Sequence, residues 1–145
     1  MRRTVIAAAL AAAAFVPVAA HADQQYIDQI VAQLIVAEAA YLSEGYVRVI
    51  GPEADRMTNG QVESYTVTLQ EGTTYIIHGV CDSDCGDLDL QLVDENGNVV
   101  SEDSTTDDQP IVNVTPAWTG QFAVNVRMYD CTNSYCYFAM AAYAN

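Results

Sequence analysis

Lysine is absent from this 145-residue chain, and five arginines stand against nineteen aspartates and glutamates. The formal net charge at pH 7 is therefore −14. Phosphate backbones and anionic lipid surfaces repel such a field, so the composition excludes nucleic acid and anionic membranes as favoured partners. Cations and basic protein surfaces are better candidates.

Residue types that carry catalysis are also scarce. Only two histidines occur, and His78 is the one that lies beyond the N-terminal apolar segment. No G-x-S-x-G turn, H-E-x-x-H helix or phosphate-binding glycine loop accompanies it. We therefore predict that the protein is not an enzyme and that His78 is a hydrogen-bonded sheet residue. A small secreted hydrolase that uses carboxylates of the acidic loops is the alternative.

Residues 1–22 have the pattern of an export signal. Two arginines precede a long apolar run, and Ala20 and Ala22 form an A-x-A cleavage site. We predict cleavage after Ala22 and a periplasmic or secreted protein. No later apolar stretch approaches the roughly 18 residues needed to cross a bilayer, so we predict no membrane span.

Residues 23–45 predict an amphipathic helix, because apolar side chains recur at spacings of three and four before Gly45. Glu38 interrupts the apolar stripe, so either that turn lies beyond the packed contact or the carboxylate meets Arg48 or Arg56. The helix packs on its own domain or docks a partner, and self-association of an envelope protein through it is a further alternative. The stripe consists of Ile27, Ile30, Val31, Leu34, Ile35, Tyr41 and Leu42.

Residues 46–60 read as a polar connector with an optional short strand at 46–50, and residues 61–145 read as strands. Apolar and polar residues alternate there with period two, and turn signals such as Asn96-Gly97 recur. Seven or eight short strands after one helix predict a mainly β protein, an antiparallel β-sandwich. Its predicted core is Leu69, Leu90, Leu92, Val112, Val114, Phe122, Val124, Val126 and Phe138.

The order of motifs from residue 60 to 143 resembles the bacterial pre-peptidase C-terminal (PPC) domain family. The motifs are Tyr65-x-Val67-x-Leu69, Gly72-x-x-Tyr75, Asp87-Leu88-Asp89-Leu90-x-Leu92, Asn96-Gly97, Pro110 to Val114 and Thr119-Gly120-x-Phe122-x-Val124-x-Val126. The resemblance implies a jelly-roll-like sandwich of a secreted protein, a role in secretion, substrate binding or solubility, and in some members bound calcium. No protease domain accompanies the motifs here, so a stand-alone module is expected.

Four cysteines in an exported protein favour disulfides, and three pairings are open. We favour Cys81 with Cys85 and Cys131 with Cys136, because each pair flanks a short polar loop. A four-cysteine zinc site is the competing interpretation, but neither pair has the usual C-x2-C spacing.

Ten acidic residues fall between Asp82 and Asp108. Calcium prefers six to eight oxygen ligands, so Asp82, Asp84, Asp87 and Asp89 are the candidate set for a calcium ion. The alternative is that these carboxylates are solvated or cap turns. No other cofactor is expected.

Tyr135, Tyr137 and Tyr143 share one face of the last predicted strand. An exposed aromatic row can stack on the sugars of a polysaccharide or anchor a protein; otherwise these rings pack beneath the helix. Together, the patterns predict an exported, non-catalytic binding or accessory module whose acidic loop end is the candidate functional surface.

Overall fold

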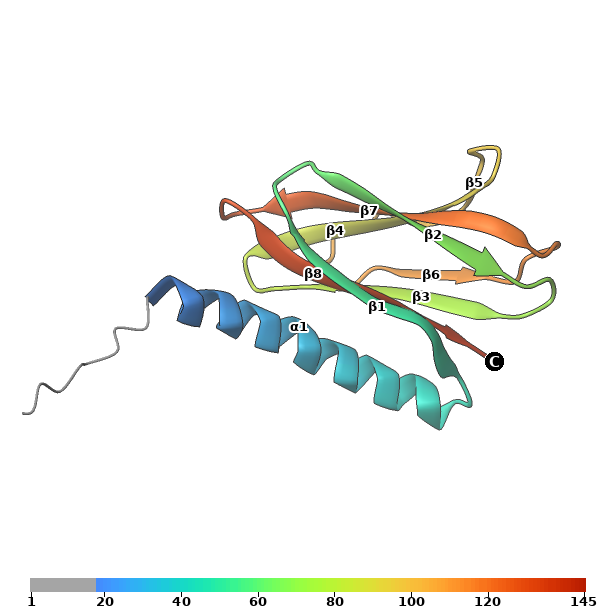
Figure 1. Cartoon of the computed structure of the whole chain (residues 1–145), viewed down its shortest axis with the longest axis horizontal. Coiled ribbons are helices and arrows are strands. Elements are labelled where there is room, and N and C mark those ends of the chain that lie inside the picture. Colours follow the sequence, from blue (N-terminus) through green and yellow to red (C-terminus); the bar gives the residue numbers. More distant parts are fainter. Residues whose placement is uncertain (1–17) are drawn as a thin grey trace, which may run out of the picture.

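The alternating apolar residues fold into two four-stranded antiparallel sheets, with one helix outside them (Figure 1). The computed structural model of the chain describes residues 18–145. Most of the predicted export signal therefore lies outside the described residues, and the helix begins at Val18. The elements are α1 (Val18–Ser43), β1 (Val47–Met57), β2 (Val62–Leu69), β3 (Tyr75–Cys81), β4 (Cys85–Asp94), β5 (Val99–Asp103), β6 (Ile111–Val114), β7 (Gly120–Cys131) and β8 (Cys136–Ala144).

The strand order is that of a jelly roll. The first sheet runs β1-β8-β3-β6 and the second runs β2-β7-β4-β5, and every neighbouring pair is antiparallel. Consecutive strands thus alternate between the sheets through most of the chain, as in a double Greek key. The predicted β-sandwich is confirmed.

The core lies between the two sheets and was largely predictable from period two. Leu88, Leu90 and Leu92 are buried on one face of β4, because alternate side chains of a strand point to the same side. Of the nine predicted core residues, eight are buried and Val114 is half-buried at the margin.

β1 begins within the optional short strand at 46–50 but continues to Met57, so it corrects the prediction of a connector after residue 50. It is an eleven-residue edge strand, and the Gly51-Pro52 pair that suggested a loop lies inside it, at an irregularity in its pairing with β8. Proline is tolerated in edge strands at such positions. Gly51 has a φ of +75°, and an added Cβ would lie 2.8 Å from the carbonyl oxygen of Met140, so glycine is required.

α1 packs on the outer face of the first sheet, on the opposite side of that sheet from the main core (Figure 1). Its contacts form a second apolar cluster in which Ile30 and Leu34 meet Val80, Ala139 and Ala141. Glu38 forms an ion pair with Arg48, with 3.4 Å between their charged atoms. Arg48 is one of the two partners predicted for Glu38.

Candidate functional site

Asp82 is a buried structural residue in the β3–β4 turn. Its side chain is 1% exposed, and its two carboxylate oxygens accept hydrogen bonds from the backbone N–H groups of Tyr137 (2.6 Å) and Asp84 (3.0 Å). Burial raises the pKa of Asp82, while these backbone donors partly offset the rise. Both oxygens are thus already used, one in joining the turn to β8 and the other within the turn itself.

Asp84 lies at the surface of the same turn, next to the N-terminal part of α1. Its carboxylate accepts a hydrogen bond from the Asn133 side chain at 3.0 Å. A hydrogen bond with the Tyr26 hydroxyl lowers the pKa of Asp84, and the hydrogen bond from Asn133 lowers it further. Asp84 therefore connects the two cysteine loops and the helix.

Both favoured cysteine pairs are bonded, Cys81 with Cys85 and Cys131 with Cys136. The Cys81–Cys85 loop is also a seat for α1: Gln33 donates to the Cys81 carbonyl oxygen at 2.8 Å, and Gln29 accepts from the Ser83 N–H at 2.9 Å.

Asp87 and Asp89 lie elsewhere, on the side of β4 that faces away from the core. Asp87 is 5% exposed, its register partner on β7 is Asp130, and its Oδ1 atom has no hydrogen-bond partner. Burial raises the pKa of Asp87, and the negative charge of the Asp107 carboxylate raises it further. Burial also raises the pKa of Asp89, and the negative charge of Asp87 raises it further. The positive charge of Arg127 opposes that rise.

The predicted calcium set is therefore divided between two places. Asp82 and Asp84 belong to the β3–β4 turn, whereas Asp87 and Asp89 belong to β4. Within residues 18–145, no three side chains of His, Cys, Asp or Glu are grouped so that they could hold a metal ion. The four aspartates therefore do not fit one calcium ion as a set.

We expect Asp87→Asn to stabilise the protein by about 1 kcal/mol at pH 7, because it removes a buried charge that has an unpartnered oxygen. A raised pKa means that the carboxyl favours folding below its ordinary pKa and that this contribution is lost as the pH rises through the folded-state pKa. The gain should therefore be smaller at pH 4 than at pH 7.

Thermal unfolding at both pH values measures this effect, and a rise of about 3–5 °C is expected at pH 7. Asp108→Asn is the matched control, since Asp108 is exposed in the same acidic region. If Asp87→Asn instead lowered the melting temperature in millimolar calcium but not with chelator, Asp87 would be a metal ligand.

The predicted tyrosine row does not form an open platform. Tyr143 is fully buried beneath α1, where its ring lies 4.7 Å from the Tyr41 ring, so its assignment as a surface binding residue is wrong. Tyr137 is half-buried and stacks on Tyr26 at 6.5 Å. The guanidinium of Arg56 lies 4.5 Å from the centre of the half-buried Tyr135 ring.

These tyrosines instead align α1 with β8. The Tyr135 hydroxyl donates to Asp23 near the start of the helix at 3.1 Å, and Tyr143 meets Tyr41 near its end. The helix rises about 27 Å from Asp23 to Tyr41, and the extended segment from Tyr135 to Tyr143 spans about 26 Å. The distances between the contact residues are therefore nearly equal on the helix and on the strand. Alanines occupy the middle of the strand.

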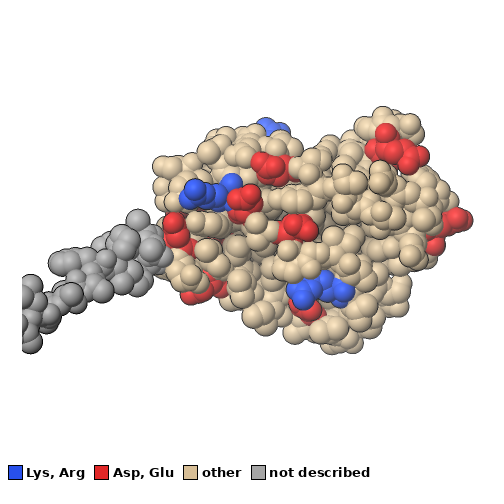
Figure 2. Space-filling model, viewed as in Figure 1, with Lys and Arg blue, Asp and Glu red and all other residues tan. Residues whose placement is uncertain are grey.

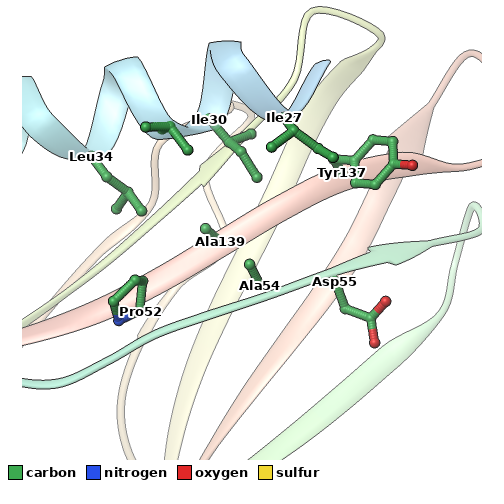
Figure 3. A pocket seen from close by; sticks show the side chains of 9 residues that line it. Ile27, Ile30, Leu34, Pro52, Ala54, Asp55, Tyr137 and Ala139 are labelled. Atoms are coloured by element: carbon green, nitrogen blue, oxygen red, sulfur yellow. The ribbon is translucent and has the colours of Figure 1, made fainter. Parts of the chain in front are cut away.

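A shallow apolar groove of about 320 Å³ lies between α1 and β1. Figure 3 shows Ile27, Ile30 and Leu34 pointing from the helix toward β8 and β1, with Asp55 at the outer rim pointing away. Ala54 and Ala139 are too small to fill the space between helix and edge strand. The groove is near the lower end of the size range of ligand pockets.

The solvent-facing side of α1 is also apolar. Ile35 is 62% exposed and Val36 is 71% exposed, and we call the exposed residues Val31, Ala32, Ile35, Val36, Ala39 and Ala40 the outer stripe. None of them is charged, although the predicted amphipathic helix should carry polar residues there. Sequence periodicity missed this feature, because it placed Val31 and Ile35 on the packed side.

Charged side chains are scattered over the face that includes α1 and β1, with uncharged surface between them (Figure 2). Neighbouring exposed apolar residues, such as those of the outer stripe, mark an interaction site more often than isolated ones do.

The free edge of β1 is protected from strand addition. Two register irregularities and Pro52 interrupt its hydrogen-bonding pattern, and the Asp55 carboxylate accepts the Arg56 backbone N–H at 2.8 Å. A partner of this region would therefore contact side chains rather than extend the sheet.

Comparison with models of known protein families finds no match, and comparison with curated proteins finds no similar sequence. The one helix of residues 18–145 is not long and apolar enough to span a membrane.

Proposed function

We propose that the protein is an exported, non-catalytic binding module that takes an apolar polypeptide segment flanked by Lys or Arg along α1. The observation that carries this proposal is the apolar outer stripe beside the α1–β1 groove, on a chain with a net charge of −14. A helix that is apolar on both sides usually has a partner on each side.

Charge supports the choice of partner. The chain carries no lysine, and Glu53, Asp55 and Asp28 flank the α1–β1 region with exposed carboxylates. Such a field attracts a cationic segment and speeds its association at low salt. Apolar side chains of the same segment would then bury the outer stripe and enter the groove.

Two disulfides are compatible with the oxidising periplasm or cell exterior. The PPC-like motifs support the same compartment, and membership of that family is part of the proposal. The sandwich acts as the rigid base, and α1 with β1 provides the surface.

A fluorescent peptide with leucines on one helical face and lysines beside them tests the proposal. We expect saturable binding by anisotropy that weakens as salt is added, because the attraction is partly electrostatic. Ala54→Leu, which fills the groove from β1, should weaken binding about tenfold, equivalent to about 1.4 kcal/mol.

Ala117→Leu is the matched control, since Ala117 is an exposed alanine outside the groove. Equal binding by a peptide with glutamates in place of the lysines would contradict the cationic partner. Cleavage of the peptide, read by mass spectrometry, would favour the hydrolase. A doubled protein mass that becomes more populated in high salt would identify a second copy as the occupant, because like-charged chains repel less when screened.

A further inference from the structure

His78 lies beneath α1 and joins the helix to the first sheet. It is 6% exposed on β3, and its Nδ1 atom is 2.8 Å from the Tyr41 hydroxyl of α1. Its other ring nitrogen, Nε2, is buried without a hydrogen-bond partner. On this flank of the helix, His78, Tyr41, Gln33 and Gln109 border a second hollow of about 400 Å³.

The contact between α1 and the first sheet contains several unsatisfied polar atoms. Gln33 Oε1, His78 Nε2 and Tyr143 Oη are all buried there without partners. Each such atom regains a hydrogen bond to water when the helix lifts, so each one weakens docking. Among the α1 residues whose burial is described, the buried apolar side chains are Ile30, Leu34 and Ala37. We therefore expect the docked helix to be held less firmly than the strands of the sandwich.

We propose that α1 is a pH-sensitive strap, in which protonation of His78 loosens the helix from the first sheet. In the imidazolium both ring nitrogens are donors. Nδ1–H then donates to the Tyr41 oxygen, the Tyr41 hydroxyl proton loses its acceptor, and a positive charge lies under an apolar helix. Lifting α1 exposes the imidazolium and the Tyr41 hydroxyl to water.

Few charges oppose this effect. The Asp107 carboxylate, from the loop between β5 and β6, is the charged group that favours the imidazolium, and the Gln109 side chain acts in the same direction. The register partners of His78 are uncharged, Ile111 on β6 and Ala141 on β8. From α1, Tyr41 faces the ring, and its pKa is raised to about 12 by burial, so it stays neutral.

The direction of the pH effect follows from burial, which lowers the pKa of His78. Docking is strongest above the ordinary histidine pKa of about 6.5 and weakens as the pH falls below it, until the docked-state pKa is reached. In that window, the docking equilibrium constant falls by up to about tenfold per pH unit.

If the proposed function holds, this strap also regulates it, because Ile27, Ile30 and Leu34 of α1 form one wall of the groove. A cationic segment bound at neutral pH would be released in a mildly acidic medium. The strap itself exists independently of any partner.

Hydrogen exchange of the α1 amides in the full chain, corrected for intrinsic rates, tests the strap between pH 7.5 and 5. We expect protection of α1 to fall as the pH drops below about 6.5 and to level off towards the docked-state pKa of the His78 imidazole, which NMR measures, while protection of β4 and β7 stays constant. His78→Gln keeps a hydrogen-bond acceptor for Tyr41 but does not titrate, so α1 protection in this variant should be independent of pH.

Constant α1 protection in the wild type, or the same fall in His78→Gln, would overturn the proposal. The NMR titration of His78 and the pH profile of α1 exchange in the wild type decide the matter even if the variant folds poorly. Failure of the peptide to bind at pH 7.5 would reject the proposed function and leave the strap unaffected.

Discussion

Asp82→Ala is expected to lower the free energy of unfolding by about 3 kcal/mol, because it removes two charge-assisted hydrogen bonds and leaves buried donors unpaired. The Tyr137 and Asp84 backbone N–H groups lose their acceptors at 2.6 and 3.0 Å. Urea unfolding at pH 7 measures the change.

Asp108→Ala is the control for loss of one negative charge, and it should change stability by no more than about 0.5 kcal/mol. Asp82→Asn keeps one carbonyl oxygen and should fall between the two. If Asp82→Ala matched Asp108→Ala in chelator but was destabilised in calcium, the aspartate would act through a metal ion rather than through the backbone.

Leu34→Asp is expected to release α1 from the sheet. The leucine is buried against the first sheet, and placing a carboxylate there removes apolar burial and adds an unpaired charge, together weakening docking by about 3 kcal/mol or more. Exchange protection of the α1 amides should disappear, and peptide binding should be lost with the groove wall.

Ile35→Asp is the matched control, one residue along the same helix. Its side chain is exposed, so the substitution should leave α1 protection unchanged. Both variants should retain the strand content of the sandwich by far-ultraviolet circular dichroism, because α1 lies outside the main core. Full α1 protection in Leu34→Asp would show that the helix is held by something other than its apolar contacts.

The strands were predictable where one face of the sheet is buried in the core and the other face is exposed to solvent. Leu88, Leu90 and Leu92 alternate with polar residues, and the Asn96-Gly97 turn is closed by a hydrogen bond from the Asp94 N–H to the Asn98 carbonyl at 2.9 Å. The disulfide pairs were predictable because each joins the two ends of one short loop. Local chemistry and tertiary structure agree at these places.

Only the first residues of β1 were predictable, as the optional short strand at 46–50. β1 is an edge strand whose Gly51-Pro52 pair carries a loop signal, and residues 51–56 are exposed, so this later part shows neither alternation nor apolar density. Its pairing with β8 is a long-range property that no local pattern encodes.

The candidate site shows the same limit. The sequence pointed to acidic and aromatic residues by type, but their roles depend on neighbours contributed by distant segments. Asp82 is satisfied by a backbone group 55 positions away, and Tyr143 is covered by a helix from the other end of the chain. The outer stripe was missed because a helix that is apolar on both sides has no single preferred face in its periodicity.

The seating of α1 on the Cys81–Cys85 loop has a consequence for biogenesis. Gln29 and Gln33 bond to backbone groups of a loop that the disulfide closes covalently. Thiol-reducing conditions inside a cell leave that loop open, so the helix meets its finished seat only after oxidation. The docked position of α1, and with it the surface proposed for binding, therefore depends on the redox state of Cys81 and Cys85.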